Sequence, residues 1–357
     1  MRPKKAKGEM LRVMQTRYQL IKACLMVVLT LSALSVVNTG TALAREKLTV
    51  YSTLEPENIA EFKKGFESEN ADIELVWVRD STGVIAARIF AAGNNQQADA
   101  IWGLAVTTLI EIKARGLLDP YAPANLPEIK PAFRDPADPP HWVGMEAWVG
   151  AVCLNTLEAA KYKLPSPKAW LDLVDPVYKG HIVMPHPASS GTGYFHVSAW
   201  IQIFGEEKAW AFMDRLHPNI AYYEHSGSKP CRQAAAGEFA IGISAEITGA
   251  QMQTRGAPVA TLLMQEGAGW EMDAAAILKG TKKSGAAKRL MDFAASRKAN
   301  ELYAGFVSQV AIDGIARPKP NYPDGVAQAM IKNDLEWAAA NRERILTEWT
   351  KRYGRGR

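Results

Sequence analysis

Small hydroxyl residues gather where a strand is expected to end, in the stretch PHPASSGTGYFHVSAW from Pro185 to Trp200. An apolar run that begins at Tyr194 follows them at once. The N-terminus of a helix offers unpaired N–H groups and the positive end of the helix dipole. Hydroxyls add donors, and glycine lets the backbone approach a ligand closely. The stretch therefore predicts an anion-binding site that needs no lysine, formed by Ser189, Ser190, Gly191, Thr192 and Gly193.

Similar clusters follow other predicted strands. They are Ser52, Thr53 and Glu55 in YSTLE, Ser81, Thr82 and Gly83 in DSTG, Ser226 and Ser228 in HSGSKP, and Ser244 and Glu246 in GISAE. Helix capping explains any one cluster alone, because Ser, Thr and Asp are ordinary N-cap residues. SSGTG is denser than a cap requires, and the clusters together indicate a shared anion site.

Two acids and one aromatic residue accompany these hydroxyls. A ligand with an anionic head and a cationic tail would use Glu55 and Glu246 to bind the cation. Each acid taken alone is better explained as a solvated loop residue. Trp102, at the end of a predicted strand, would form an apolar or cation–π wall, or else belong to the core.

The elements that must position these residues alternate strand with helix. The first half is expected to contain strands at 48–52, 73–79 and 98–104, with helices from Pro56, after the DSTG loop and at 107–121. This order predicts an α/β fold with a parallel sheet flanked by helices. Such sheets bind ligands beyond the carboxyl ends of their strands.

A proline-rich surface loop at 121–140 and a long strand at 141–156 lead into a second set of elements. We expect them in this order: a helix from Pro167, a strand at 181–185, a helix through Trp200 and Phe204, strands at 219–227 and 239–244, a strand and helix within 272–296, and an amphipathic helix at 331–353.

The N-terminus predicts secretion. Basic residues precede an apolar run at 23–37, which ends in small residues at Ala42 and Ala44, an arrangement typical of signal-peptide cleavage. The run is shorter than the roughly 20 residues that a membrane-spanning helix needs. We therefore predict a signal peptide over 1–44, cleaved after Ala44, rather than an uncleaved anchor. Met10 or Met14 could be the true start.

The charge of the chain depends on this leader. The whole chain carries a formal charge of +5, but residues 1–44 hold seven of its 42 basic residues and one of its 37 acidic ones. The remaining 313 residues carry −1, which gives no reason to expect nucleic-acid or membrane-surface binding. Two cysteines remain, Cys153 and Cys231, which either pair in an oxidising periplasm or stay as separate thiols.

Motifs of enzymes are absent from the sequence. It contains no P-loop, no G-x-G-x-x-G, no G-x-S-x-G elbow and no Cys/His cluster of the kind that binds a metal. His225 lies beside a serine loop, but no aspartate is evident to orient it. We therefore predict that the protein is not an enzyme and needs no metal and no cofactor, with a secreted hydrolase as the alternative.

The order of signal peptide, α/β half, crossing strand and second α/β half resembles periplasmic substrate-binding proteins of ABC transporters. The segments YSTLEPENIAEFKK, WVRDSTGVI, QADAIWGLA, MPHPASSGTGY and HSGSKPCRQAAAGEFAIGIS are most similar to the 2-aminoethylphosphonate-binding branch, a relative of the ferric-iron-binding proteins. This resemblance implies a type II periplasmic-binding-protein fold of two lobes with a ligand cleft between them. Lobe one would comprise 45–148 and 272–357, and lobe two 149–271.

The resemblance also implies a function. The protein would capture 2-aminoethylphosphonate, or a related aminophosphonate, in the periplasm and deliver it to a permease in the inner membrane, and we expect it to do so as a monomer. SSGTG would hold the phosphonate, DSTG would close from the other lobe, and Glu55 or Glu246 would pair with the amine. The alternatives are a binder of ferric iron or of a phosphorylated metabolite.

The iron alternative can be weighed on the residues. Iron-binding relatives use paired tyrosines after the GIS strand, where this chain has Ala245, Glu246 and Ile247. Its own pair, Tyr222 and Tyr223, lies one strand earlier. The phosphonate-binding branch usually has aromatic residues at both positions that flank the acid, so their replacement here predicts a wider pocket.

Overall fold

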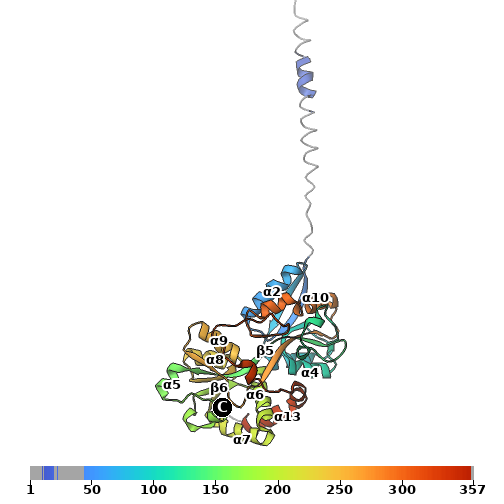
Figure 1. The fold of residues 1–357 in the computed structure, drawn as a ribbon. Coiled ribbons are helices and arrows are strands. Elements are labelled where there is room, and N and C mark those ends of the chain that lie inside the picture. The colour runs from blue at the N-terminus through green and yellow to red at the C-terminus, as the bar shows by residue number, and fades with distance from the viewer. Residues whose placement is uncertain (1–9, 11, 20–21, 23–43, 355–357) are drawn as a thin grey trace, which may run out of the picture. The chain divides into compact units, whose positions relative to one another are not determined.

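The computed structural model describes residues 10, 12–19, 22 and 44–354, and the chain divides into two units, 1–44 and 45–357 (Figure 1). The predicted apolar run of the signal peptide and Ala42 lie outside the described residues. Within the described part of the chain, no helix combines the length and the apolar character that crossing a membrane requires.

The first half of the second unit alternates strand with helix, as the sequence predicted, but the helix predicted at 107–121 ends at Ala114 and a short strand, Leu118–Asp119, follows it. Its elements are β1 (Glu46–Ser52), α2 (Pro56–Glu69), β2 (Ile73–Arg79), α3 (Thr82–Ala92), β3 (Ala100–Ala105), α4 (Val106–Ala114) and β4 (Leu118–Asp119). β1 pairs in parallel with both β2 and β3. Pro56 suits the first turn of α2, because its fixed φ is already helical. Phe62 and Phe66, one turn apart on α2, are fully buried.

Two long strands cross between the lobes. β5 (Trp142–Asn155) pairs antiparallel with β10 (Trp270–Leu278) along its first half. From Gly150 onward β5 instead pairs with β8 (Ile241–Ala245) and β9 (Val259–Leu262). Trp270 lies opposite Val149 in the β5–β10 ladder, so the two predicted boundaries between the lobes lie side by side. We call β5 and β10 the crossing strands.

Lobe two repeats the α/β pattern around its own core. Besides β8 and β9 it contains α5 (Thr156–Tyr162), β6 (Ile182–Pro185), α6 (Gly191–Phe204), α7 (Glu206–Leu216), β7 (Ile220–Glu224), α8 (Lys229–Ala236) and α9 (Glu246–Thr254). β6 pairs in parallel with β7 and β8. Figure 1 shows α5, α7, α8 and α9 around this lobe, and α2, α4 and α10 around lobe one.

The helix predicted from Pro167 is replaced by two short 3₁₀ helices, Trp170–Val174 and Pro176–Tyr178. Asp175 separates them, and Pro176 begins the second at a first-turn position that suits proline. A full helix, α5, stands earlier than expected. Its cap is Asn155, whose side chain accepts hydrogen bonds from the N–H groups of Leu157 and Glu158.

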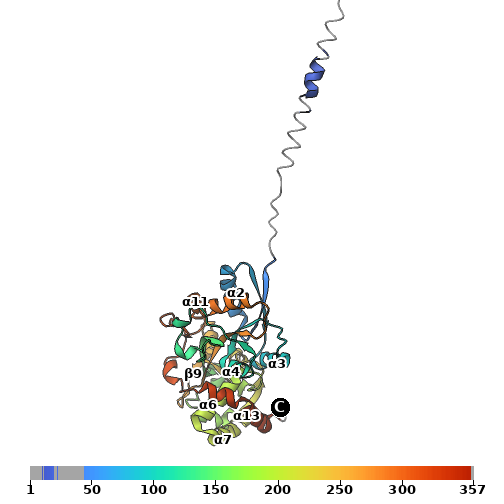
Figure 2. The same ribbon diagram turned by 90° about the vertical axis from the view of Figure 1, so that its right-hand side faces the viewer.

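After the crossing strands the chain forms α10 (Ser284–Ala294), α11 (Arg297–Tyr303), β11 (Gln309–Val310), α12 (Val326–Ala329) and α13 (Leu335–Tyr353). The sequence assigned all of 272–357 to lobe one. In the structure, Ala338, Ile345 and Trp349 of α13 pack into the core of lobe two instead. α13 also touches α4 of lobe one, and Figures 1 and 2 both show it beside α6. Its apolar face therefore spans both lobes.

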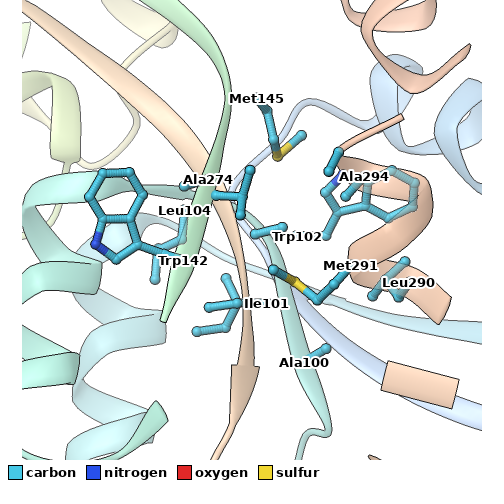
Figure 3. Close-up of a cluster of buried hydrophobic side chains, with 14 of the residues drawn as sticks. Ala100, Ile101, Trp102, Leu104, Trp142, Met145, Ala274, Leu290, Met291 and Ala294 are labelled. Atoms are coloured by element: carbon cyan, nitrogen blue, oxygen red, sulfur yellow. The ribbon is translucent and has the colours of Figure 1, made fainter. Parts of the chain in front are cut away.

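Trp102 belongs to the core of lobe one. It is fully buried and stacks on Trp77 and Phe62, and its Nε1–H donates to the Tyr303 hydroxyl at 2.9 Å. Figure 3 shows Trp102 among buried side chains of β3, α10 and the crossing strands. The structure thus places Trp102 in the core, the second of the two positions that the sequence left open.

Cys153 of β5 and Cys231 of α8 form a disulfide bond. Both residues are fully buried, and the bond joins α8 to the crossing strand inside lobe two. The sequence could not choose between this pair and two free thiols, because it gives no distance between residues 78 positions apart.

Candidate ligand-binding site

A cavity of about 130 Å³ lies between the two lobes. Lobe one lines it with the ends of β1 and β2 and the start of α3, and lobe two with the starts of α6, α8 and α9. The crossing strands contribute Glu146, Trp148 and Asp273. The cavity thus stands at the carboxyl ends of parallel strands, where such sheets bind ligands.

Most of the predicted hydroxyl clusters meet at this cavity. The predicted site residues that line it are Thr53, Glu55, Ser81, Thr82, Ser190, Gly191, Thr192, Ser226 and Ser228. Their elements come from both lobes, so only the folded chain brings them together. Ser81 and Ser190 are the N-cap residues of α3 and α6, which places two helix N-termini at one cavity. We call Ser81, Thr82, Ser190, Gly191, Thr192, Ser226 and Ser228 the cradle.

The other predicted residues of these loops support the cradle from outside the cavity. The N–H of Gly83 donates to the carbonyl oxygen of Ser189 in the opposite lobe at 2.9 Å. The N–H of Gly193 donates to Oγ of Ser190 at 3.2 Å and so completes the cap of α6. Ser52 is fully buried, and its Oγ accepts the N–H of Leu54 at 3.2 Å.

Direct contacts hold the two lobes together around the cavity. The Ser81 hydroxyl donates to the carbonyl oxygen of His225 at 3.2 Å, and the Ser228 hydroxyl donates to Oε1 of Glu55 at 2.7 Å. Arg232 of lobe two reaches Glu55 at 3.2 Å and Glu57 at 3.7 Å. The structure therefore represents the closed arrangement of the lobes.

Two arginines that the sequence analysis missed line the same cavity. Arg79 is the last residue of β2, and its Nη2 lies 3.1 Å from Oε2 of Glu55. Arg232 reaches the same oxygen from the other lobe. Glu55 is thus held between two guanidinium groups and a serine hydroxyl. Arg79 stands directly before DSTG in the sequence, and that position was the signal that could have identified it.

The carboxylate of Glu246 already accepts hydrogen bonds from other residues of the protein, and Glu246 is not among the residues that line the cavity. It is fully buried, with Oε2 accepting the N–H of Val149 at 2.6 Å and Oε1 accepting the hydroxyl of Tyr322 at 2.7 Å. Burial raises its pKa to about 7. The geometry shows Glu246 bracing the crossing strand β5 where it passes between the lobes.

Two further acids in the cavity were also missed. Glu146 and Asp273 stand directly opposite each other on the crossing strands. Burial raises the pKa of Asp273 to about 8, and the charge of Glu271 adds to this. Burial also raises the pKa of Glu146 well above its usual range, with contributions from the charges of Asp273 and Glu246. Both acids lie within strands rather than in the hydroxyl-rich loops that follow strands, so those loops gave no indication of them.

These raised pKa values predict that the ligand-free protein loses stability as the pH rises from 6.5 to 8.5. The pKa values of Glu246 and Glu271 are raised to about 7, and that of Asp273 to about 8. In this window the folded state binds more protons than the unfolded state, so the free energy of unfolding falls as the pH rises. His196, whose burial lowers its pKa to about 4, acts oppositely, but only below about pH 6.5.

We expect a loss of about 2 kcal/mol from Asp273 alone, because each pH unit between its two pKa values is worth about 1.4 kcal/mol. Thermal unfolding at pH 6.5, 7.5 and 8.5 and constant ionic strength measures it. The variant Asp273→Asn should show a flatter profile. A melting temperature that stays constant or rises across the window would contradict the prediction.

Comparison with known proteins agrees with this architecture. Residues 105–334 match the family model of the bacterial extracellular solute-binding proteins. An uncharacterized protein of Haemophilus influenzae is 31% identical over 319 residues, which cover 87% of this chain and 92% of that protein. A probable ABC transporter periplasmic-binding protein of Sinorhizobium fredii is 24% identical over 308 residues, 82% of each chain.

Among solved structures, the periplasmic binding protein AfuA of Actinobacillus pleuropneumoniae, with exogenous fructose-6-phosphate bound, superimposes with a TM-score of 0.82. It is 30% identical and covers 87% of this chain and 99% of its own. The predicted type II periplasmic-binding-protein fold is therefore confirmed. AfuA and the matched family are binding proteins rather than enzymes. On its sequence and its fold, the chain belongs to the family of bacterial extracellular solute-binding proteins.

Proposed function

We propose that this protein is the periplasmic receptor of an ABC importer for a small aminophosphonate such as 2-aminoethylphosphonate. It captures the ligand between its lobes and delivers it to a membrane permease without changing it chemically. The observation that carries this proposal is the cradle, where hydroxyls and helix N-termini from both lobes face one small cavity.

The cradle suits a tetrahedral anion. A Cβ atom added to Gly191 would lie 2.8 Å from Oγ1 of Thr82, so the starts of α3 and α6 stand close together across the cleft. A Cβ atom added to Gly227 would lie 3.0 Å from Oγ of Ser190 and 2.3 Å from Oγ1 of Thr192. Backbone N–H groups and hydroxyls so packed can donate to all three oxygens of a phosphonate.

The second candidate ligand is a phosphorylated metabolite. The AfuA structure was determined with fructose-6-phosphate, and a phosphate ester presents the same three oxygens to the cradle. A cavity of about 130 Å³ favours a more compact molecule, which supports the aminophosphonate.

A ferric ion has less support. Of the residues that the structure describes, those that line the cavity include no tyrosine and no histidine. Tyr222 and Tyr223 lie instead on an outer groove beside His186 and His225. The phenolates expected of an iron site are therefore away from the cavity between the lobes.

Thr192→Val tests the role of the cradle, because valine keeps the shape of threonine and removes only its hydroxyl. We expect affinity for 2-aminoethylphosphonate to fall about tenfold, the value of one hydrogen bond to a charged group, with an unchanged melting temperature. Titration calorimetry measures it. Thr261→Val is the matched control, because it removes a hydroxyl on β9, outside the cavity, that has no partner among the described residues.

The same titrations should include fructose 6-phosphate, inorganic phosphate and ferric citrate. Preferential binding of 2-aminoethylphosphonate supports the proposal. Binding of fructose 6-phosphate alone would establish the second candidate in its place, and binding of ferric citrate alone would overturn both.

A further inference from the structure

Two carboxylic acids face each other across the crossing strands. Glu146 of β5 and Asp273 of β10 are direct partners in the antiparallel ladder. Side chains in such a pair project from the same face, with Cβ atoms roughly 5 Å apart. Both residues line the cavity, yet only 3% of Glu146 and 7% of Asp273 is exposed. Two acids therefore share one small volume in the cavity wall.

The protein itself leaves hydrogen-bonding atoms of this pair without a partner. Within the described part of the chain, Oε2 of Glu146 and Oδ1 of Asp273 are buried without a hydrogen-bond partner. No described arginine, lysine or histidine forms an ion pair with either acid, whereas Arg79 and Arg232 both pair with Glu55 in the same cavity. Buried polar atoms in folded proteins nearly always have a hydrogen-bond partner, so we expect this pair to bind a group from outside the chain.

The acids that the sequence suggested for the amine are less suited to it. Glu55 already accepts a serine hydroxyl and pairs with two guanidinium groups. Glu246 already accepts an N–H and a tyrosine hydroxyl, and it lies behind the cavity wall. An ammonium group would have to break these contacts at either residue. At Glu146 and Asp273 it would break none.

We propose that Glu146 and Asp273 together bind the ammonium group of the ligand, while the cradle binds its anionic group. This assignment rests on the proposed function and makes the ligand class specific: a short zwitterion with a phosphonate or phosphate at one end and a primary amine at the other. One ammonium group supplies donors to both unpartnered oxygens, and its positive charge favours the ionised form of two acids whose pKa values burial raises in the ligand-free protein. A ligand without the amine leaves both acids buried and unpartnered, which is the source of discrimination.

The position of the pair also gives binding an order. Both acids belong to one ladder within lobe one, so their arrangement does not depend on closure. The cradle, in contrast, takes Ser81 and Thr82 from lobe one and its other members from lobe two, so closure completes it. The amine subsite is therefore formed before the anion subsite, and the ligand bridges the two when the lobes close.

Titration calorimetry with matched ligands tests the assignment. The ligands are 2-aminoethylphosphonate and 2-hydroxyethylphosphonate, which differ in the amine alone, and the proteins are the wild type, Glu146→Gln and Asp273→Asn. We expect the wild type to prefer the amine at least 100-fold. Each amide variant should lose most of that preference while binding the hydroxyl ligand as well as the wild type does. Thr192→Val, the control in the cradle, should weaken both ligands equally.

Equal affinity of the wild type for both ligands, or an unchanged preference in both amide variants, would overturn the assignment. If the wild type binds neither phosphonate, the proposed function has failed, and the pair is tested with glucosamine 6-phosphate against glucose 6-phosphate. A preference for the amino sugar that the amide variants abolish then supports the subsite, and its absence overturns it. The melting temperature of each variant confirms that it is folded. If one of the two amide variants does not fold, the other alone is enough for the test.

Discussion

Gly83→Ala should hold the two lobes apart and reduce ligand affinity about 100-fold. A Cβ atom at this position would lie 2.2 Å from the carbonyl oxygen of Ala188 and 3.0 Å from Cα of Ser189, both backbone atoms of the opposite lobe. Backbone atoms cannot rotate out of the way as a side chain can. The closed arrangement would therefore lose about 3 kcal/mol, the upper end of the usual range for overpacking, which corresponds to about 100-fold in affinity.

The variant alters no side chain of the cradle and leaves the fold of lobe one intact. Gly83 stands in the first turn of α3, where alanine is a better helix former than glycine, so the melting temperature should not fall. The measurements are titration calorimetry with 2-aminoethylphosphonate and small-angle X-ray scattering with and without it. The wild type should become more compact when ligand is added, and Gly83→Ala should not.

The matched control is Gly285→Ala, in the first turn of α10, where an added Cβ atom meets no other atom within 4 Å. It should bind and close as the wild type does. Wild-type affinity and a compact ligand-bound form of Gly83→Ala would show that the lobes close without the contact between Gly83 and Ser189.

Loss of the Cys153–Cys231 disulfide should lower the free energy of unfolding by about 4 kcal/mol. The bond joins residues 78 positions apart, and a loop of that length loses much of its conformational freedom in the unfolded chain when it is closed. Both cysteines are fully buried, so the reduced protein gains no solvation of its thiols while it stays folded. The double variant Cys153→Ala, Cys231→Ala should unfold at a clearly lower urea concentration than the wild type.

Reductant provides the control for this prediction. Dithiothreitol should lower the urea midpoint of the wild type toward that of the double variant and leave the double variant unchanged. Ligand affinity should remain close to the wild-type value in native conditions, because neither cysteine lines the cavity. A wild-type midpoint that dithiothreitol does not move, with the thiols shown to be reduced, would mean that the bond adds no stability.

The elements of the fold could be predicted from the sequence where local chemistry specifies them. The strand predicted at 73–79 has those same bounds in β2, because its apolar run lies between a turn and a polar loop. The helix predicted from Pro56 begins there, since proline favours a first helical turn. The hydroxyl loops could be predicted for the same reason. Ser and Thr at a strand–helix junction cap the helix that directly follows them, so their role depends only on neighbouring residues.

What the sequence could not determine depends on residues far apart in the chain. Glu146 lies in the middle of an apolar strand, and only the register of β5 against β10 reveals Asp273 as its neighbour. Glu55 looked like a free acid until the structure placed Arg232, from the other lobe, beside it. The disulfide was undecided for the same reason. The sequence assigned α13 to lobe one with the rest of 272–357, but its apolar face fits either lobe by its pattern alone, and its buried residues pack into the core of lobe two.

The sequence by itself thus determined the compartment we expect, the α/β class and the hydroxyl loops of an anion site, because each of these follows from residues adjacent in the chain. The tertiary structure alone decided which acids face the cavity and which are already neutralised. Strand register and the contact between lobes decide whether a buried carboxylate has a hydrogen-bond or ion-pair partner. Both depend on residues far apart in the chain, so no short segment of the sequence predicts them.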